Sequence, residues 1–179
     1  MRHKRKLLSL LPVLLVVGTL LIYRGIELSK APPTASAGGD VRLQKAIDGD
    51  TIEVVDHGTK HTVRLIGINT PETVDPRKPV QCFGHEASQK TKELTAGGIA
   101  RLEVDPLVGD TDKYGRWLRY VYLPDGSMLN ARLVAEGYAY EYTYQSQPYT
   151  HQAEFKAAAK AAREQGLGLW SDVTCAGKL

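Results

Sequence analysis

Cysteine is scarce in this chain of 179 residues, which contains only Cys82 and Cys175. Neither has a second cysteine at the C-x-x-C spacing of a structural zinc site. The histidines that flank the predicted hairpin turn or begin the predicted helices also lack a partner at metal-ligand spacing. The sequence therefore argues against a metal site built from soft or imidazole ligands.

A strong positive field is also missing from most of the chain, despite a formal net charge of +3. Residues 1–30 hold six Lys/Arg and one acidic residue, so residues 31–179 hold 17 basic and 19 acidic residues and sum to −2. A weakly acidic domain does not attract polyanions over its whole surface. Any nucleic-acid binding must then come from a local cluster of basic side chains.

One apolar run stands apart at residues 7–23, which number 17 and carry no charge. This length is at the short end of the roughly 17 to 25 residues that can span a bilayer. The run follows four basic residues within 1–6, which predicts a cytoplasmic amino terminus and an exported remainder. It is either an uncleaved anchor, followed by a linker at 24–40, or a signal peptide with a small-residue cleavage site at 35–37. The domain would lie outside the cytoplasm on a single-pass anchor, or be secreted.

Export makes a disulfide between Cys82 and Cys175 the expected state of the two cysteines. Because the cysteines lie 93 positions apart, this bond would tie the carboxyl terminus back to the domain at 41–179. On the chain-entropy model, closing so long a loop contributes about 4 to 5 kcal/mol.

The rest of the sequence predicts five short strands and three helices, with no internal repeat. Short β-branched segments separated by turn residues predict strands at 41–47, 51–55, 60–68, 99–104 and 117–123. Helical patterns ending at glycine predict helices at 86–98, 127–137 and 151–166. Five strands with a helix between the third and the fourth are typical of an OB-fold barrel, an α+β, mainly β, architecture that often binds oligonucleotides or oligosaccharides.

Arg64 lies within an apolar strand whose two faces are both expected to be partly buried. Removing a guanidinium from water is costly unless an anion meets it. Two partners fit its fork of donors, namely a carboxylate of this chain or a substrate phosphate. The residues alone leave both open.

Three polar clusters end the predicted strands: Asp48-Gly-Asp50-Thr51, Asn69-Thr70-Pro71-Glu72 and the segment from Asp110 to Arg116. Each alone could be an ordinary turn. The third is no EF-hand, because its twelfth position is Val121 where a bidentate Glu is required. Together they supply what phosphodiester hydrolysis needs: a base for water, cations for the developing charge, and oxygen ligands for a hard metal ion.

Five motifs occur in the same order as in the staphylococcal nuclease (thermonuclease) family, which the sequence resembles over about residues 41–171. They are KAIDGDT, VRLIGINTPET, FGHEAS, DKYGRWLRYVY and the GLW that follows the last helix. The resemblance implies an OB-fold barrel with three helices and a Ca²⁺-dependent nuclease that cleaves DNA and RNA to leave 3′-phosphate ends. It also implies catalytic roles for Arg64, Glu72 and Arg116.

The same resemblance implies that Asp50 and the carbonyl of Thr70 bind the metal ion. The family's second metal aspartate corresponds to Asn69, which keeps an oxygen but loses a charge, so weaker Ca²⁺ binding is expected.

The family's base-stacking tyrosines correspond to Tyr114 and, in a register ambiguous by one residue, to Tyr142 and Tyr144. The last two could equally be a half-buried strand edge. Lys113 either contacts a phosphate or is a solvated loop lysine.

Two other classes of function compete with a nuclease. An OB-fold module that binds nucleic acid or another polyanion without cutting it is favoured by Asn69 and by the net charge of −2. The second alternative is a structural domain stabilised by its disulfide. It accounts for the two cysteines but assigns no function to the three polar clusters. The expected partners are a DNA or RNA substrate and, if the apolar run is uncleaved, the membrane; the protein is expected to be a monomer.

Overall fold

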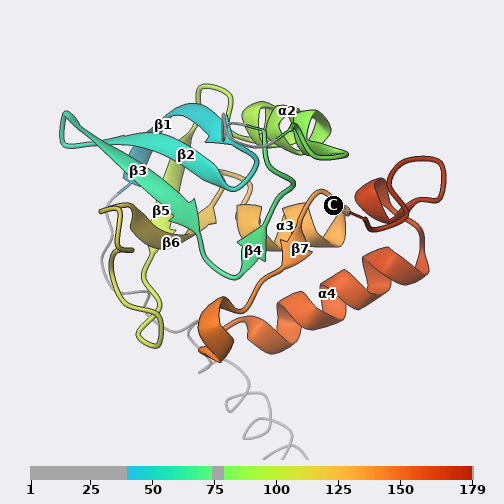
Figure 1. The fold of residues 1–179 in the computed structure, drawn as a ribbon. Coiled ribbons are helices and arrows are strands. Elements are labelled where there is room, and N and C mark those ends of the chain that lie inside the picture. The colour runs from blue at the N-terminus through green and yellow to red at the C-terminus, as the bar shows by residue number, and fades with distance from the viewer. Residues whose placement is uncertain (1–39, 74–78, 179) are drawn as a thin grey trace, which may run out of the picture. The chain divides into compact units, whose positions relative to one another are not determined.

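In the computed structural model of the chain, residues 40–73 and 79–178 are described. Five strands close into a barrel in the order β1-β2-β3-β6-β5, and two further strands, β4 and β7, pair with each other (Figure 1). The pairs are antiparallel except β3 with β6, which run parallel. The strands are β1 (Asp40–Asp48), β2 (Thr51–Asp56), β3 (Thr59–Leu65), β4 (Ile68–Asn69), β5 (Ile99–Glu103), β6 (Trp117–Tyr122) and β7 (Tyr140–Glu141).

Three α-helices and two short 3₁₀ segments complete the described residues. They are α2 (Gly84–Leu94), α3 (Leu129–Ala135), α4 (Gln152–Glu164), η2 (Tyr144–Ser146) and η3 (Gly168–Trp170). The predicted OB-type barrel with three helices is confirmed, with a helix between the third and fourth barrel strands as expected.

The predicted apolar anchor at 7–23 and the linker at 24–40 lie outside the described residues, except for Asp40, which begins β1. Within 40–73 and 79–178, no helix combines the length and apolar character needed to cross a membrane.

The barrel core follows from the alternation of side chains along the strands, because successive residues face opposite sides of a sheet. Ile52 and Val54 of β2 and Val63 and Leu65 of β3 are almost completely buried. The helices add Leu133 of α3 and other apolar residues to the same core cluster. This packing gives the polar strand ends a rigid frame.

The sequence predicts a single strand over 60–68, and this is wrong in one respect, since β3 ends at Leu65. The chain turns at residues 66–67 because Gly67 adopts a φ of 78°, which favours glycine. A Cβ at Gly67 would also come within 2.6 Å of the Tyr149 ring. The last three residues of the predicted strand therefore leave the barrel, and Ile68 enters β4, which pairs with β7.

Asn130, at the start of α3, holds this corner in place. Its side chain is fully buried, and its Nδ2 donates to the carbonyls of Ile66, at 2.9 Å, and Arg119, at 3.2 Å. Its Oδ1 accepts from the amide of Val121 at 3.1 Å. Asn130 therefore joins α3, β6 and the turn after β3.

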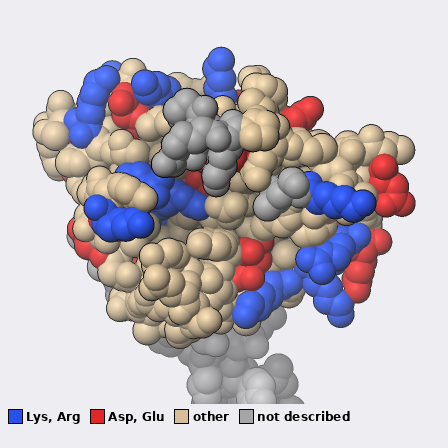
Figure 2. All heavy atoms as spheres, in the orientation of Figure 1, with Lys and Arg blue, Asp and Glu red and all other residues tan. Residues whose placement is uncertain are grey.

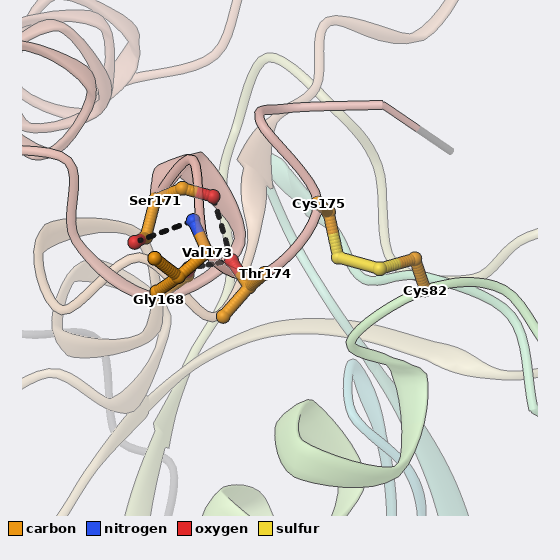
Figure 3. Close-up of a disulfide and its surroundings, with 6 residues drawn as sticks. All are labelled: Cys82, Gly168, Ser171, Val173, Thr174 and Cys175. Carbon is orange, nitrogen blue, oxygen red and sulfur yellow. Dashed lines mark hydrogen bonds between the residues drawn. A yellow bond between two sulfur atoms is a disulfide. The ribbon is translucent and has the colours of Figure 1, made fainter.

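The predicted disulfide is present. Cys82 precedes α2 and is bonded to Cys175 of the carboxyl-terminal segment, with the two Cα atoms 5.9 Å apart (Figure 3). The terminal segment is itself docked, because Leu169 is fully buried and its amide donates to the carbonyl of Gly137 at 2.9 Å. The bond thus joins two ordered parts of one domain.

Replacing both cysteines, in Cys82→Ala/Cys175→Ala, is expected to lower the free energy of unfolding by about 2 to 5 kcal/mol, because the bond closes a long loop in the unfolded chain. Urea unfolding followed by tryptophan fluorescence measures this change. The wild-type protein in reducing buffer should lose a similar amount. Unchanged midpoints in both samples would contradict the stabilising role.

Candidate active site

The polar strand ends meet around one cavity of about 570 Å³ beside the barrel. It collects side chains from the β1–β2 turn, the end of β3, β4, the segment that follows it, and the loop before β6. All the predicted catalytic and metal-ligating residues line it, namely Asp50, Arg64, Asn69, Thr70, Glu72 and Arg116, together with Asp48, Thr51 and Gln81.

Arg64 is the most enclosed cation of this cavity, with only 13% of its side chain exposed. Its Nη1 donates to the carbonyls of Leu65 and Ile68, both at 2.9 Å. The turn after β3 therefore folds around the guanidinium. Burial lowers the pKa of Arg64, and the negative charge of Asp50 opposes that shift.

The other terminal nitrogen of Arg64 faces the acidic side of the cavity. Its Nη2 lies 3.0 Å from Asp50 Oδ2 and donates to Asn69 Oδ1 at 3.1 Å. The carboxylate partner considered from the sequence is thus present, and it is Asp50. This carboxylate is tightly fixed, because its Oδ2 also accepts the amide of Thr70 at 3.0 Å and its Oδ1 accepts the hydroxyl of Thr51 at 3.0 Å.

The oxygens of Asp50, Asn69 and Thr70 fit a hard cation. The backbone carbonyl of Thr70 accepts one long hydrogen bond, of 3.4 Å, from the side-chain Nδ2 of Asn69. The hydroxyl oxygen of Thr70 is buried without a hydrogen-bond partner, and it packs so closely on Gly49 that a Cβ there would lie 2.7 Å away. Such an oxygen is one that a cation or a water would satisfy.

All these donors are oxygens, as Ca²⁺ and Mg²⁺ prefer. Among the described residues, no group of three or more His, Cys, Asp or Glu side chains is placed to hold a metal ion. A cation at this site would therefore depend on carbonyl, amide and water oxygens as well as on Asp50.

Asp48 also lines this cavity, although its place in the β1–β2 turn predicted no further role for it. Burial raises the pKa of Asp48, and the charges of Asp50 and Glu72 act in the same direction. Its Oδ1 accepts from the amide of Gly49 at 2.7 Å and from the hydroxyl of Thr73 at 2.9 Å, and these bonds oppose the shift. Asp48 therefore links the β1–β2 turn to the segment that carries Glu72.

Gln81 is a second residue that no motif revealed. Its side-chain Oε1 accepts the backbone amide of Glu72 at 2.6 Å, and its own amide donates to the carbonyl of Glu72 at 2.9 Å. Two hydrogen bonds thus fix the backbone of Glu72, whose side chain is half-buried at the cavity wall.

Arg116 is presented by a loop that Asp112 closes. The Oδ1 of Asp112 accepts the amides of Tyr114, at 2.9 Å, and Arg116, at 3.0 Å. Its Oδ2 lies 2.7 Å from both Nε and Nη2 of Arg116. Burial alone would raise the pKa of Asp112, but the bonds from Arg116 and Tyr114 outweigh it and lower the pKa.

A second cavity, of about 470 Å³, shares part of its lining with the first. Both cavities are lined by Arg64, Asn69 and Arg116. The second also contains all four predicted substrate-binding residues, Lys113, Tyr114, Tyr142 and Tyr144. The arginines therefore line both an acidic cavity and an aromatic one.

The three predicted stacking tyrosines of the second cavity are exposed, whereas Tyr149, which also lines it, is buried in the core. Tyr114 is 72% exposed, with the Arg116 guanidinium 5.5 Å and the Lys113 ammonium 5.0 Å from its ring centroid. The rings of Tyr142 and Tyr144 lie 6.4 Å apart, and both residues follow the end of β7 at Glu141. They are thus not the strand edge considered from the sequence.

The charges of the described residues agree with the weakly acidic composition. On the face shown in Figure 2, Lys and Arg side chains form separate groups, with Asp and Glu between them. The basic groups that face the cavities are therefore local, as the sequence required.

Replacing Arg64 by methionine is expected to lower the free energy of unfolding by about 3 to 5 kcal/mol, because Asp50 stays buried without its partner. The double variant Arg64→Met/Asp50→Asn should recover part of this loss. Urea unfolding measures both. The control, Arg101→Met, breaks a more exposed pair with Glu103 and should cost less than about 1 kcal/mol. Equal losses for Arg64→Met and the control would contradict the ion pair's structural role.

Comparisons with known proteins agree with this geometry. The family model described as "Staphylococcal nuclease homologue" matches residues 62–172. The SPbeta prophage-derived endonuclease YokF of Bacillus subtilis (strain 168) is 43% identical over 134 residues, which are 74% of this chain and 44% of YokF. Endonuclease YncB of the same organism is 42% identical over 134 residues, which are 74% of this chain and 62% of YncB.

The thermonuclease of Staphylococcus hyicus is similar over more of its length, with 35% identity across 166 residues that cover 89% of this chain and 96% of the relative. The chain thus spans less than two thirds of the two Bacillus proteins and nearly all of the staphylococcal one. The match to the family model covers more than half of the chain, and the barrel and its cavity have the architecture that the motifs implied. The chain therefore belongs to the staphylococcal nuclease family.

Proposed function

We propose that the protein is a Ca²⁺-dependent nuclease that hydrolyses phosphodiester bonds of DNA and RNA and leaves 3′-phosphate ends. One observation carries the proposal: Arg64 and Arg116 line both an acidic cavity that contains Glu72 and a cavity that contains the exposed Tyr114, Tyr142 and Tyr144. A nucleotide fits this arrangement, with its phosphate at the arginines and its base among the tyrosines. Family membership and the names of the relatives support the same activity.

Glu72 is the proposed general base. A base must reach the attacking water with its proton-accepting oxygen at about 2.6 to 3.2 Å. Gln81 fixes the backbone of Glu72 at the cavity wall. The Glu72 side chain therefore starts from a fixed point when its carboxylate accepts the proton. The carboxylate takes a proton from the water as the water oxygen bonds to phosphorus. The bond between phosphorus and the 5′ oxygen breaks, and the departing 5′ oxygen gains a proton from solvent, which leaves the phosphate on the 3′ side.

Arg64 and Arg116 are the proposed clamp on the scissile phosphate. Charge builds on the phosphoryl oxygens during attack, and prepositioned donors stabilise it without reorganising at that moment. Arg64 is held on two carbonyls and Arg116 on Asp112, so both guanidinium groups are oriented beforehand. A guanidinium fork suits two phosphate oxygens at once. Because Asp50 and Asp112 meet these forks in the structure, a bound phosphate would take over part of the contacts that these two carboxylates make.

Asp50, Asn69 and the carbonyl of Thr70 would hold the cation. A bound divalent cation supplies positive charge that polarises a phosphate oxygen. Because Asn69 replaces a carboxylate, we propose that affinity for Ca²⁺ is modest.

The tyrosines would hold bases by stacking, each worth about 1 to 3 kcal/mol. Lys113, with a fully exposed ammonium, would add a phosphate contact at the rim.

Export is proposed from the apolar run at 7–23 and the basic residues before it, with the domain anchored at the membrane or secreted. The disulfide supports an oxidising compartment. A monomer is proposed, since every proposed catalytic group belongs to one chain.

Glu72→Gln is expected to lower the rate of phosphodiester hydrolysis by about a thousandfold, because an amide cannot accept the proton of water. Release of acid-soluble nucleotides from heat-denatured DNA measures this rate, with Ca²⁺ and with chelator. Glu86→Gln, in the exposed first turn of α2, is the matched control and should keep full activity.

Retained hydrolysis in Glu72→Gln would remove Glu72 from the role of base. If the folded wild-type protein binds DNA but releases nothing at any Ca²⁺ concentration, the non-catalytic OB-fold binding module becomes the better assignment. Asn69 and the weakly acidic charge of the domain are the observations that favour it.

Asn69→Asp is expected to tighten Ca²⁺ binding by about tenfold, because a carboxylate replaces a neutral amide among the ligands. Isothermal titration calorimetry measures the dissociation constant without any substrate. Asn69→Ala removes the oxygen and should weaken binding. Equal affinity in all three proteins would place the cation elsewhere.

A further inference from the structure

We propose that Gln81 is a positioning residue for Glu72, and that the Cys82–Cys175 disulfide anchors Gln81 to the docked carboxyl terminus. This inference rests on the proposed function, in which Glu72 is the base. It assigns to the disulfide a role at the active site, beyond the closing of a long loop.

The contact between Gln81 and Glu72 is reciprocal. The amide of Glu72 donates to Gln81 Oε1 at 2.6 Å, and the amide of Gln81 donates to the carbonyl of Glu72 at 2.9 Å. Both polar groups of the Glu72 backbone are therefore bonded to one residue. Because the backbone determines the direction of the Cα–Cβ bond, these hydrogen bonds fix the direction in which the Glu72 side chain leaves the backbone.

The start of α2 holds the same segment from the other side. A Cβ on Gly84 would lie 2.6 Å from Thr73 Cγ2 and 3.2 Å from the carbonyl oxygens of Pro71 and Glu72. This close approach allows only glycine. The residue before it, Phe83, has a φ of 65°, in the left-handed region that non-glycine residues rarely adopt. Such a conformation persists only where its surroundings enforce it.

Two contacts flank this strained position and enforce it. The Phe83 ring packs on Tyr138, with centroids 5.4 Å apart. Cys82, the residue before Phe83 and after Gln81, is covalently bonded to Cys175.

Cys175 is a firm anchor, because its own segment is tied down. Thr174 Oγ1 donates to the carbonyls of Gly168, at 2.7 Å, and Ser171, at 3.0 Å (Figure 3). The amide of Gly177 donates to the carbonyl of Leu169 at 2.8 Å. Cys175 is buried, whereas Cys82 is exposed. The disulfide thus runs from a docked terminus to the loop that holds the base.

Position matters for a general base, since it must meet water in a narrow range of geometries. If the anchor were lost, the Gln81 loop would lose its covalent support and keep only non-covalent ones, such as the start of α2 and the contact between Phe83 and Tyr138. Glu72 would then sample more positions, and the chemical step would slow while substrate binding, which depends on the arginines and tyrosines, would not change.

The first test uses the full-length chain with Gln81→Met, which keeps the length of the side chain but removes the acceptor, and Gln81→Glu, which keeps an acceptor oxygen. Gln81→Met should lower kcat about tenfold and leave KM within about twofold. Gln81→Glu should recover most of that loss. A fall in kcat that Gln81→Glu does not rescue, or a change in KM alone, would overturn the positioning role.

The second test does not require activity. Hydrogen exchange of the Glu72 amide in full-length Cys82→Ala/Cys175→Ala should be at least about tenfold faster than in the wild type, with amides of β2 and β3 unchanged. Val54→Ala, a barrel-core variant, controls for general destabilisation and should not single out Glu72. Equal protection of Glu72 in the wild type and the cysteine variant would overturn the anchor.

The two tests also separate this inference from the proposed function. A wild-type protein that hydrolyses no phosphodiester would overturn the proposed function. The exchange measurement would still decide whether the disulfide holds the Glu72 backbone.

Discussion

The enclosure of one guanidinium organises this end of the barrel. Arg64 needs acceptors because it is mostly removed from water, and the chain supplies them by ending β3 at Leu65 and turning. Two carbonyls, one amide oxygen and the Asp50 carboxylate meet its two terminal nitrogens. The same turn sends the chain into β4, which places Asn69 and the segment through Glu72 beside the β1–β2 turn. The position of the acidic groups thus follows from how one cation is satisfied.

Helix α2 gives these segments a common support. Thr91, which is fully buried on its inner face, donates to the carbonyl of Gly49 at 2.6 Å. Gly84, at the start of the helix, packs against the segment that carries Glu72. One rigid element therefore contacts both the turn that carries Asp50 and the segment that carries the base. Catalytic geometry of this kind depends on supports outside the first layer of side chains.

The sequence predicts the barrel well because alternation and turn residues are local signals, and its motifs identify the residues that meet at the cavity. It does not predict the break after Leu65, since that depends on Asn130, which bonds the carbonyl of Ile66 from 64 positions away. Nor does it reveal Gln81, whose partner Glu72 is reached through backbone bonds that no motif encodes. The choice of Asp50 as the partner of Arg64 likewise needed three-dimensional geometry, because two types of anion fitted the pattern equally.

The covalent link between Cys82 and Cys175 has a consequence for timing. Disulfides persist in oxidising compartments and are rare where glutathione keeps thiols reduced. The two cysteines lie 93 positions apart, so the link can close only after the ribosome has added the whole segment between them. A newly made chain in a reducing cytoplasm would carry its base on a less restrained loop. The active site would then reach its fully restrained form only in an oxidising compartment.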